Sequence, residues 1–236
     1  MSDKMFKNAK RRARDRLENA IDKANTVSDG RVPFDPSTLN DSVAMQAGWT
    51  PGRRKQGASF QTHKLVTVNS NRIELRVSLA IKLTYFIFLL SGIGMIIGVF
   101  YPNLSSGEFS FNETTFAASF LGLVCAGVGG CLLYFGTAPI VFDQRRGYFW
   151  KGRQAPHEVL ERKAAGRFAE LEQIHALQLI SKRVRTDRRS YYSFELNIVL
   201  DNASRINVVD YGNPRKIRED AITLSEFLGK PVWDAI

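Results

Sequence analysis

Residues 83–101 read LTYFIFLLSGIGMIIGVFY, and no charged side chain interrupts this run. The whole chain carries 33 Lys and Arg against 23 Asp and Glu, and its mean hydropathy is −0.18. The run therefore lies in an otherwise polar and basic chain. A helix needs about 20 apolar residues to cross a hydrocarbon core of about 30 Å, so the run is long enough to span a membrane.

A second run without charge, TTFAASFLGLVCAGVGGCLLYFGTAPIVF, covers residues 114–142. A soluble domain of this size rarely buries two helices of such length. We therefore predict transmembrane helices at 79–101 and 115–136, joined by an external loop at 102–114. The first run begins too far from the N-terminus for a signal peptide.

Basic residues near the two spans predict the orientation of the hairpin. Lys and Arg close to a span favour the cytoplasmic side of the membrane. The loop between the helices has none, whereas the outer flanks carry Arg72, Arg76 and Lys82 before the first helix and Arg145, Arg146, Lys151 and Arg153 after the second. Both termini are predicted to lie in the cytoplasm, and we assign the protein to a bacterial inner membrane.

Small residues recur in both apolar runs and predict close helix packing in lipid. The set comprises Gly94 and Gly98 in the first helix and Ala118, Gly122, Ala126 and Gly130 in the second. Packing within the hairpin is one interpretation, and homo-oligomerisation is the other. Beyond Lys82, neither span contains an ionisable residue of the kind that ion pathways use, which argues against transport.

The sequence predicts no compact domain before residue 58. Residues 1–30 form a basic helical pattern with a thin apolar stripe, which fits either a helix on the membrane surface or a solvated tail. Residues 31–57 contain three prolines and several polar breakers, so we predict a linker.

Strand patterns follow on both sides of the apolar runs. A hairpin is predicted at 58–77, directly before the first helix. The segment 155–170 reads as a loop with a short helix. Further strands are predicted at 138–143, 148–152, 171–184, 192–200 and 205–211. A closing helix at 214–228 has Asn213 as its cap, Pro214 at its first position and Gly229 at its end.

The predicted fold is an α+β membrane protein with a mainly antiparallel β domain. Isolated hairpins are marginal in water, so the hairpin at 58–77 is expected to join the strands within 138–236. Seven strands and a closing helix resemble the pleckstrin-homology-like (PH-like) fold, here split by the transmembrane hairpin. The stretch Leu171–Val232, which ends in LGKPV, resembles bacterial membrane-anchored PH-like proteins. The resemblance implies a small barrel used for binding and assigns no residue a role.

Catalytic and metal-binding patterns are scarce in the sequence. His63, His157 and His175 lack metal-ligand spacing to one another or to a cysteine. Cys125 and Cys131 are six residues apart, on different faces of a helix, which argues against a disulfide. The chain has no nucleophile elbow and no phosphate-binding glycine loop. We therefore expect no enzyme activity, no cofactor and no metal.

Two basic segments are candidate contacts for anionic lipid or a protein partner. The first, 145–153, includes Lys151 and Arg153. The second, 182–189, includes Lys182, Arg183, Arg185, Arg188 and Arg189. Arginine suits a phosphate headgroup because it binds bidentately. The alternative is that both segments are solvated. Nucleic acid is a poor fit, because no recognisable binding module accompanies these arginines.

The functional prediction is a membrane-anchored interaction module that binds a protein partner or acts in assembly, with anionic lipids at its basic surface. Two alternatives stay open. One is a toxin-immunity or accessory protein acting at the membrane, and the other is a subunit of an oligomeric channel.

Overall fold

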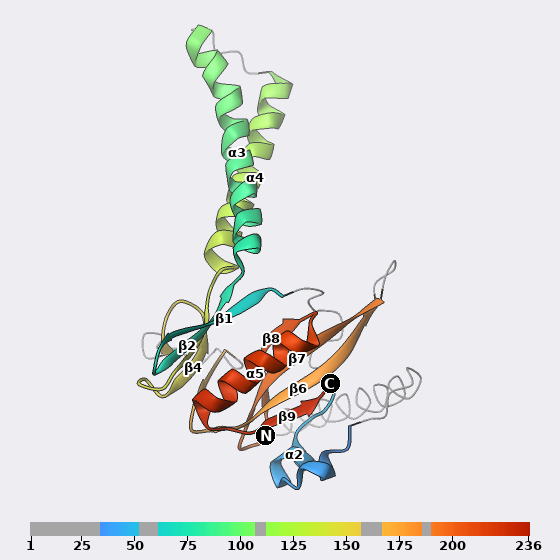
Figure 1. The fold of residues 1–236 in the computed structure, drawn as a ribbon. Coiled ribbons are helices and arrows are strands. Elements are labelled where there is room, and N and C mark those ends of the chain that lie inside the picture. Colours follow the sequence, from blue (N-terminus) through green and yellow to red (C-terminus); the bar gives the residue numbers. More distant parts are fainter. Residues whose placement is uncertain (1–33, 52–60, 107–111, 157–166, 186–189) are drawn as a thin grey trace, which may run out of the picture. The chain divides into compact units, whose positions relative to one another are not determined.

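The computed structural model describes residues 34–51, 61–106, 112–156, 167–185 and 190–236. The chain divides into two compact units (Figure 1). Unit 1 comprises Met1–Ser59 and Gln173–Ile236, and unit 2 comprises Phe60–Glu172. Both combine helices with mainly antiparallel sheet, as the α+β prediction requires. The predicted segment 1–30 lies outside the described residues.

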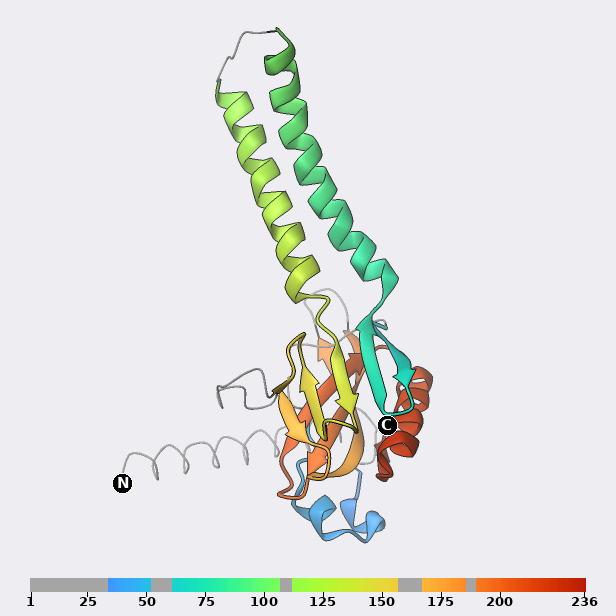
Figure 2. The same cartoon turned by 90° about the vertical axis from the view of Figure 1, so that its left-hand side faces the viewer.

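Unit 2 holds one sheet and two long helices (Figure 2). Its elements are β1 (His63–Asn69), β2 (Arg72–Val77), α3 (Leu79–Ser106), α4 (Glu113–Phe135), β3 (Ile140–Asp143), β4 (Tyr148–Lys151) and β5 (Phe168–Glu170). The strand order is β1-β2-β3-β4-β5. β2 pairs with β3 in antiparallel register from Arg72 opposite Asp143 to Leu75 opposite Ile140. Strands on both sides of the helical hairpin therefore join one sheet, as predicted for residues 58–77.

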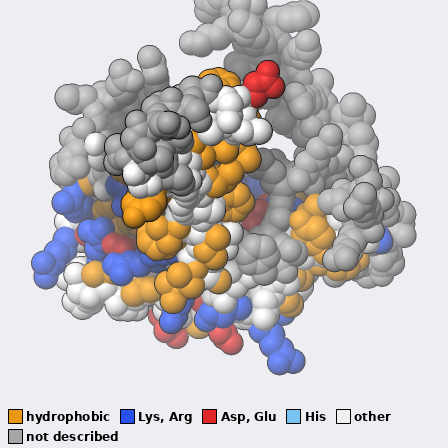
Figure 3. Space-filling model, turned by 90° about the horizontal axis from the view of Figure 1, so that it is seen from above, with side chains coloured by type: hydrophobic (Ala, Val, Ile, Leu, Met, Phe, Trp, Pro, Cys, Tyr) orange, Lys and Arg blue, Asp and Glu red, His pale blue; other side chains and the backbone are white. Residues whose placement is uncertain are grey.

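Helices α3 and α4 are long and apolar enough to cross a membrane. Their large side chains point outward: Leu79 is 70% exposed, Ile87 64% and Phe135 73%. Figure 3, which looks along the helices, shows a broad group of hydrophobic side chains at the surface. Water would penalise such a surface, whereas hydrocarbon would not.

Unit 1 is built on a second sheet. Its elements are η1 (Pro36–Leu39), α2 (Ser42–Gln46), β6 (Ile174–Arg185), β7 (Ser190–Leu200), β8 (Arg205–Tyr211), α5 (Pro214–Leu228) and β9 (Val232–Ala235). The strand order is β8-β7-β6-β9, and β9 runs parallel to β6. Helix α5 has the predicted bounds, with the Asn213 side chain accepting from the Arg215 and Lys216 amides and Gly229 in a left-handed conformation.

The two faces of the unit 1 sheet carry different side chains because alternate strand residues point to opposite faces. The register places Leu179 opposite Leu196 and Leu177 opposite Ile198 on one face. Helix α5 packs on this apolar face through Ile217, Ala221 and Leu224, which are fully buried. The other face carries Gln178, Lys182, Ser193, Glu195 and Asn197, all buried despite their polarity.

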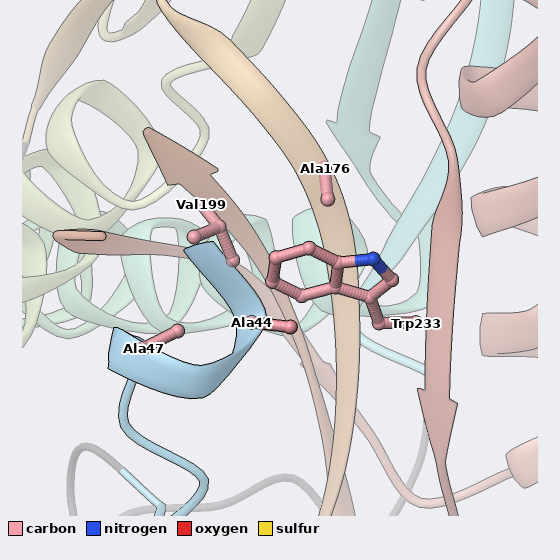
Figure 4. Packing of buried hydrophobic residues seen from close by; sticks show 5 residues of the cluster. All are labelled: Ala44, Ala47, Ala176, Val199 and Trp233. Atoms are coloured by element: carbon pink, nitrogen blue, oxygen red, sulfur yellow. The ribbon is translucent and has the colours of Figure 1, made fainter. Parts of the chain in front are cut away.

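The segment predicted as a linker, 31–57, contains η1 and α2 within its described part. Ala44 and Ala47 are buried in a cluster with Ala176, Val199 and Trp233 (Figure 4). Leu39, Val43 and Trp49 pack against the same cluster. The sequence signal was weak because these residues follow no sustained helix or strand period.

The β-rich domain predicted at 138–236 is divided between the two units in the structure. Strands β3 to β5 belong to unit 2, and β6 to β9 belong to unit 1. Two strands were not predicted. β5 has three residues, of which only Ala169 is buried, and β9 has four, so neither is long enough for a clear alternating pattern. The PH-like assignment stays a prediction.

Candidate functional site

The contact between α3 and α4 is made by small residues. A Cβ added to Gly92 would lie 2.3 Å from the Ala126 amide nitrogen, and one added to Gly129 would lie 2.5 Å from the Leu89 amide nitrogen. A Cβ on Gly122 would lie 2.9 Å from the Gly92 carbonyl oxygen. The helices therefore approach backbone to backbone, as small residues allow in lipid.

The predicted packing residues fall into two groups. Gly122 and Ala126 lie at the helix contact, whereas Gly94, Gly98 and Gly130 have open space where a Cβ would be. The GMIIG spacing marks a face of α3 that does not meet α4, because any two glycines four apart share a face whether or not that face meets a partner. A role of this face in homo-oligomerisation stays a prediction. Gly92 and Gly129, which the sequence analysis omitted, take their places.

The sheet of unit 2 continues directly into α3. Ser78 alone separates β2 from the helix. The Ser78 amide donates to the Thr62 carbonyl at 3.0 Å, and the Lys82 amide donates to the Ser78 carbonyl at 3.2 Å. Ser78 therefore donates to the segment beside β1 and accepts from the first turn of α3.

Arg153 binds the end of α4. Its Nε and Nη2 donate to the Tyr134 carbonyl at 3.3 and 3.2 Å, and Nη2 donates to Thr137 Oγ1 at 2.8 Å. The guanidinium also lies 5.2 Å from the centre of the Tyr134 ring. The last carbonyls of a helix lack intrahelical partners and carry partial negative charge, which a cation stabilises. The antiparallel β3–β4 hairpin thus returns the chain toward the helix end, and the contact of Arg153 in the structure is with α4.

His63 and Lys151 lie near this helix end of the sheet. His63 pairs with Val77 in the ladder, and Lys151 pairs with Ile140. Burial, together with the nearby positive charge of Lys151, lowers the pKa of His63 from 6.5 to about 4. The His63 Nδ1 lies 2.9 Å from Thr62 Oγ1. The ring is therefore neutral at physiological pH.

A charged row runs along β2 on one face of the sheet. Glu74 accepts from Arg72 Nε at 2.8 Å and from Arg76 Nε at 2.7 Å. Arg72 also lies 3.5 Å from Asp143 and 5.5 Å from the centre of the Trp150 ring. The Trp150 indole nitrogen is buried and, within the described part of the chain, has no hydrogen-bond partner.

Lys182 is not a surface residue, so the prediction that it contacts lipid or a partner is wrong. Its side chain is 2% exposed, and Nζ donates to Glu195 at 2.7 Å and to Asp210 at 2.8 Å. Burial acts to lower the pKa of Lys182, but the hydrogen bonds to Asp210 and Glu195 outweigh it, and the pKa is raised. A buried charge needs such partners. In sequence it could not be told from the arginines beside it.

The other cations of segment 182–189 lie in different places. Arg183 is exposed on β6, and its Nη2 lies 3.4 Å from Ser190 Oγ. Arg185 is the last residue of β6. Arg188 and Arg189 lie outside the described residues. The structure brings Lys182 to the sheet interior and leaves Arg183 at the surface, as alternation along a strand requires.

An Asp–His–Asp arrangement fixes α2 to the sheet of unit 1. The His175 ring nitrogens lie 2.8 Å from Asp41 and 3.4 Å from Asp201. The Asp41 carboxylate also accepts from the Val43 and Ala44 amides, as the N-cap of α2. The hydrogen bond from His175, with help from these amides, keeps the pKa of Asp41 below its usual value against the effect of burial. The geometry explains His175 as a structural residue.

Arg205 makes a second polar contact between segment 34–51 and the sheet of unit 1. Its Nη2 donates to the Thr50 carbonyl at 2.8 Å, and Nη1 donates to Gln178 at 3.3 Å. Gln178 in turn donates to the Gly48 carbonyl at 3.1 Å. Burial lowers the pKa of Arg205, and the charge of Glu195 opposes that change. Segment 34–51 is therefore held by a cation and an amide as well as by apolar packing.

Metal chemistry finds no support among the described residues, where no three His, Cys, Asp or Glu side chains form a group able to hold an ion. Comparisons of the chain with protein-family models, curated proteins and solved structures found no match. The junction between the sheet of unit 2 and its two helices is therefore the candidate functional site.

Proposed function

We propose that this protein is an integral protein of the bacterial inner membrane that acts by binding rather than by catalysis. In this proposal α3 and α4 span the bilayer, and both termini lie in the cytoplasm. The β-rich units serve as an interaction module for a protein partner, in a scaffold or assembly role. The observation that carries the proposal is the direct attachment of the unit 2 sheet to both helices.

The attachment has a mechanical consequence. Because only Ser78 lies between β2 and α3, little backbone freedom separates the strand from the helix. Arg153 ties the segment after β4 to the last turn of α4. A flexible tether would let a domain sample many distances from the bilayer. A sheet attached as here is held close to the membrane surface, which suits a protein that positions a partner there.

Labelling of single cysteines tests the membrane topology. The background replaces Cys125 and Cys131 with alanine, and the test variants are Asn112→Cys, at the start of α4, and Gln154→Cys, beside Arg153. A membrane-impermeant maleimide should label Cys at 112 in spheroplasts and Cys at 154 only after the inner membrane is opened. Labelling of both sites in intact spheroplasts, or the reverse order, contradicts the proposal.

Photo-cross-linking in cells tests the binding role. A photoreactive residue replaces exposed Thr67 on β1 of the full-length protein, and the matched control replaces outward-facing Ile87 on α3. The proposal expects one recurrent foreign protein captured from position 67 and only lipid from position 87. Recovery of no foreign protein from position 67, or of the same proteins from both positions, contradicts it.

A further inference from the structure

The charges of the unit 2 sheet are distributed unevenly between its two ends. The end that joins α3 and α4 carries six cations among the described residues, here called the basic end: Lys64, Arg76, Lys82, Lys151, Arg153 and Arg167. Segments 61–65, 75–82, 136–140 and 151–154, which form this end, contain no Asp or Glu. Glu74 lies in the next row of the sheet, paired with Val66 and Val141. The opposite end is mixed, with Asp143 and Glu170 among Arg72, Arg145 and Arg146. The excess of positive charge is thus larger at the end that joins α3 and α4. Figures 1 and 2 show where the sheet meets these helices.

Two of these cations are neighbours across the ladder. Lys64 on β1 pairs directly with Arg76 on β2. Both are exposed, and the Arg76 side chain is 48% accessible. Like charges directly opposite each other in a sheet are unfavourable. A bound anion would relieve this repulsion.

Arg76 keeps donors for such an anion. Its Nε donates to Glu74, a carboxylate that also accepts from Arg72. Arg72 also lies 3.5 Å from Asp143, so two carboxylates face the two arginines, and the charge of Lys64 is added to a pair that is already balanced. Among the described residues, the terminal nitrogens of Arg76 have no other recorded partner. Terminal guanidinium nitrogens match the oxygens of a phosphate group.

We propose that the basic end binds the phosphate of anionic phospholipid headgroups, with Lys64 and Arg76 as its core. The inference rests on the proposed function, because it requires α3 and α4 to lie in a bilayer. Arg76 is three residues before Leu79, where α3 begins, and Lys82 lies in the first turn of that helix. Headgroups would surround this junction, within reach of long basic side chains. The predicted candidates Lys151 and Arg153 contribute charge to the same end.

The test measures lipid selectivity of the full-length protein in reconstituted phosphatidylcholine bilayers. Spin-labelled phosphatidylglycerol and spin-labelled phosphatidylcholine give the relative association constant by electron paramagnetic resonance. The test variant is K64Q/R76Q. The matched control, R145Q/R146Q, removes the same charge from the opposite end of the sheet. A third variant, K64R/R76K, keeps the charge. Circular dichroism checks that each variant folds.

The wild-type protein should prefer phosphatidylglycerol. Each basic residue near an anionic surface is worth about fivefold in association, so K64Q/R76Q, which removes two, should lower the preference by about 25-fold. R145Q/R146Q should change it less than twofold, and K64R/R76K should retain it. No preference in the wild type, or an equal loss in both charge-removing variants, overturns the inference.

A soluble phosphate is the other source of the same chemistry. Calorimetric titration of the detergent-solubilised protein with inorganic phosphate separates the two. Phosphate binding that K64Q/R76Q abolishes, in a protein without lipid preference, overturns the lipid assignment. Alkaline carbonate extraction distinguishes the two proposals: release of the chain from membranes refutes the proposed function, whereas retention without lipid preference refutes only this inference.

Discussion

The two units differ in what they bury and what they expose. Unit 1 buries charged side chains, with Lys182 at 4% exposure and Glu195 at 2%, and unit 2 exposes Leu79, Ile87 and Phe135 along its helices. In unit 1 the charges are tolerated because they pair with one another. In unit 2 the exposed hydrophobes are tolerated if the surrounding solvent is lipid. Burial alone therefore says little until the solvent and the partner of each side chain are known.

Loss of the buried lysine should give the largest effect. Lys182→Met leaves Glu195 and Asp210 without their shared cation, and we expect a loss of about 3–5 kcal/mol in the free energy of unfolding. Arg218→Met is the control, because Arg218 and Asp234 are each 40% exposed and such an ion pair is worth about 0.2–1 kcal/mol. Denaturant unfolding of the detergent-solubilised protein measures both. An equal loss of stability in both variants would show that burial of the Lys182 ion pairs adds nothing to their contribution to stability.

A pair of alanine substitutions compares the helices of the two units. Leu224→Ala on α5 removes a fully buried side chain and should cost about 2–5 kcal/mol. Ile87→Ala on α3 removes an outward-facing side chain and should change stability by less than about 0.5 kcal/mol in detergent. Thermal unfolding monitored by circular dichroism gives both values. A large loss at position 87 would place that side chain in a protein contact rather than in lipid.

Acid should weaken unit 2 through His63. The pKa of His63 is lowered from 6.5 to about 4 by burial and by Lys151, so the unfolded chain binds the proton more readily than the folded one. Stability should therefore fall as pH drops from about 6.5 to about 4, by up to about 3 kcal/mol. Hydrogen exchange of the β1 and β2 amides measures this. His63→Gln should flatten the pH profile, and an unchanged profile would assign the titration to another group.

Two leucine substitutions test which face of α3 meets α4. Gly92→Leu would drive a side chain into the Ala126 backbone and should cost about 1–3 kcal/mol. Gly94→Leu has open space and should be close to neutral. Melting temperature in detergent compares the two. A greater loss at Gly94 would indicate an intermolecular contact and support homo-oligomerisation.

The smallest effect is expected where the sheet meets α4. Arg153→Gln removes the cation at the Tyr134 carbonyl, and the exposed site limits the loss to about 0.3–1 kcal/mol. Arg145→Gln, at the other end of the sheet, is the matched control. Chemical denaturation of both variants checks the difference. If Arg153→Gln loses no more stability than Arg145→Gln, then Arg153 does not stabilise the junction between the sheet and α4.

The apolar helices, the strands on both sides of them and the closing helix could all be predicted from local sequence patterns. These features depend on local patterns: uncharged runs long enough for a bilayer, period-two alternation, and the Asn213, Pro214 and Gly229 signals. The return of Arg153 toward the helix end was also predictable, because a short hairpin reverses direction within a few residues.

Only the tertiary structure decided which side chains meet. Gly92 contacts α4 and Gly94 does not, although the sequence offers both as small residues of one helix. Lys182 is buried beside Glu195 and Asp210, whereas Arg183, the next residue, is exposed. Ala44 and Ala47 pack against Trp233, far away in the chain. Local pattern fixes the type and ends of an element, but its partners depend on contacts between distant segments, which a single sequence does not contain.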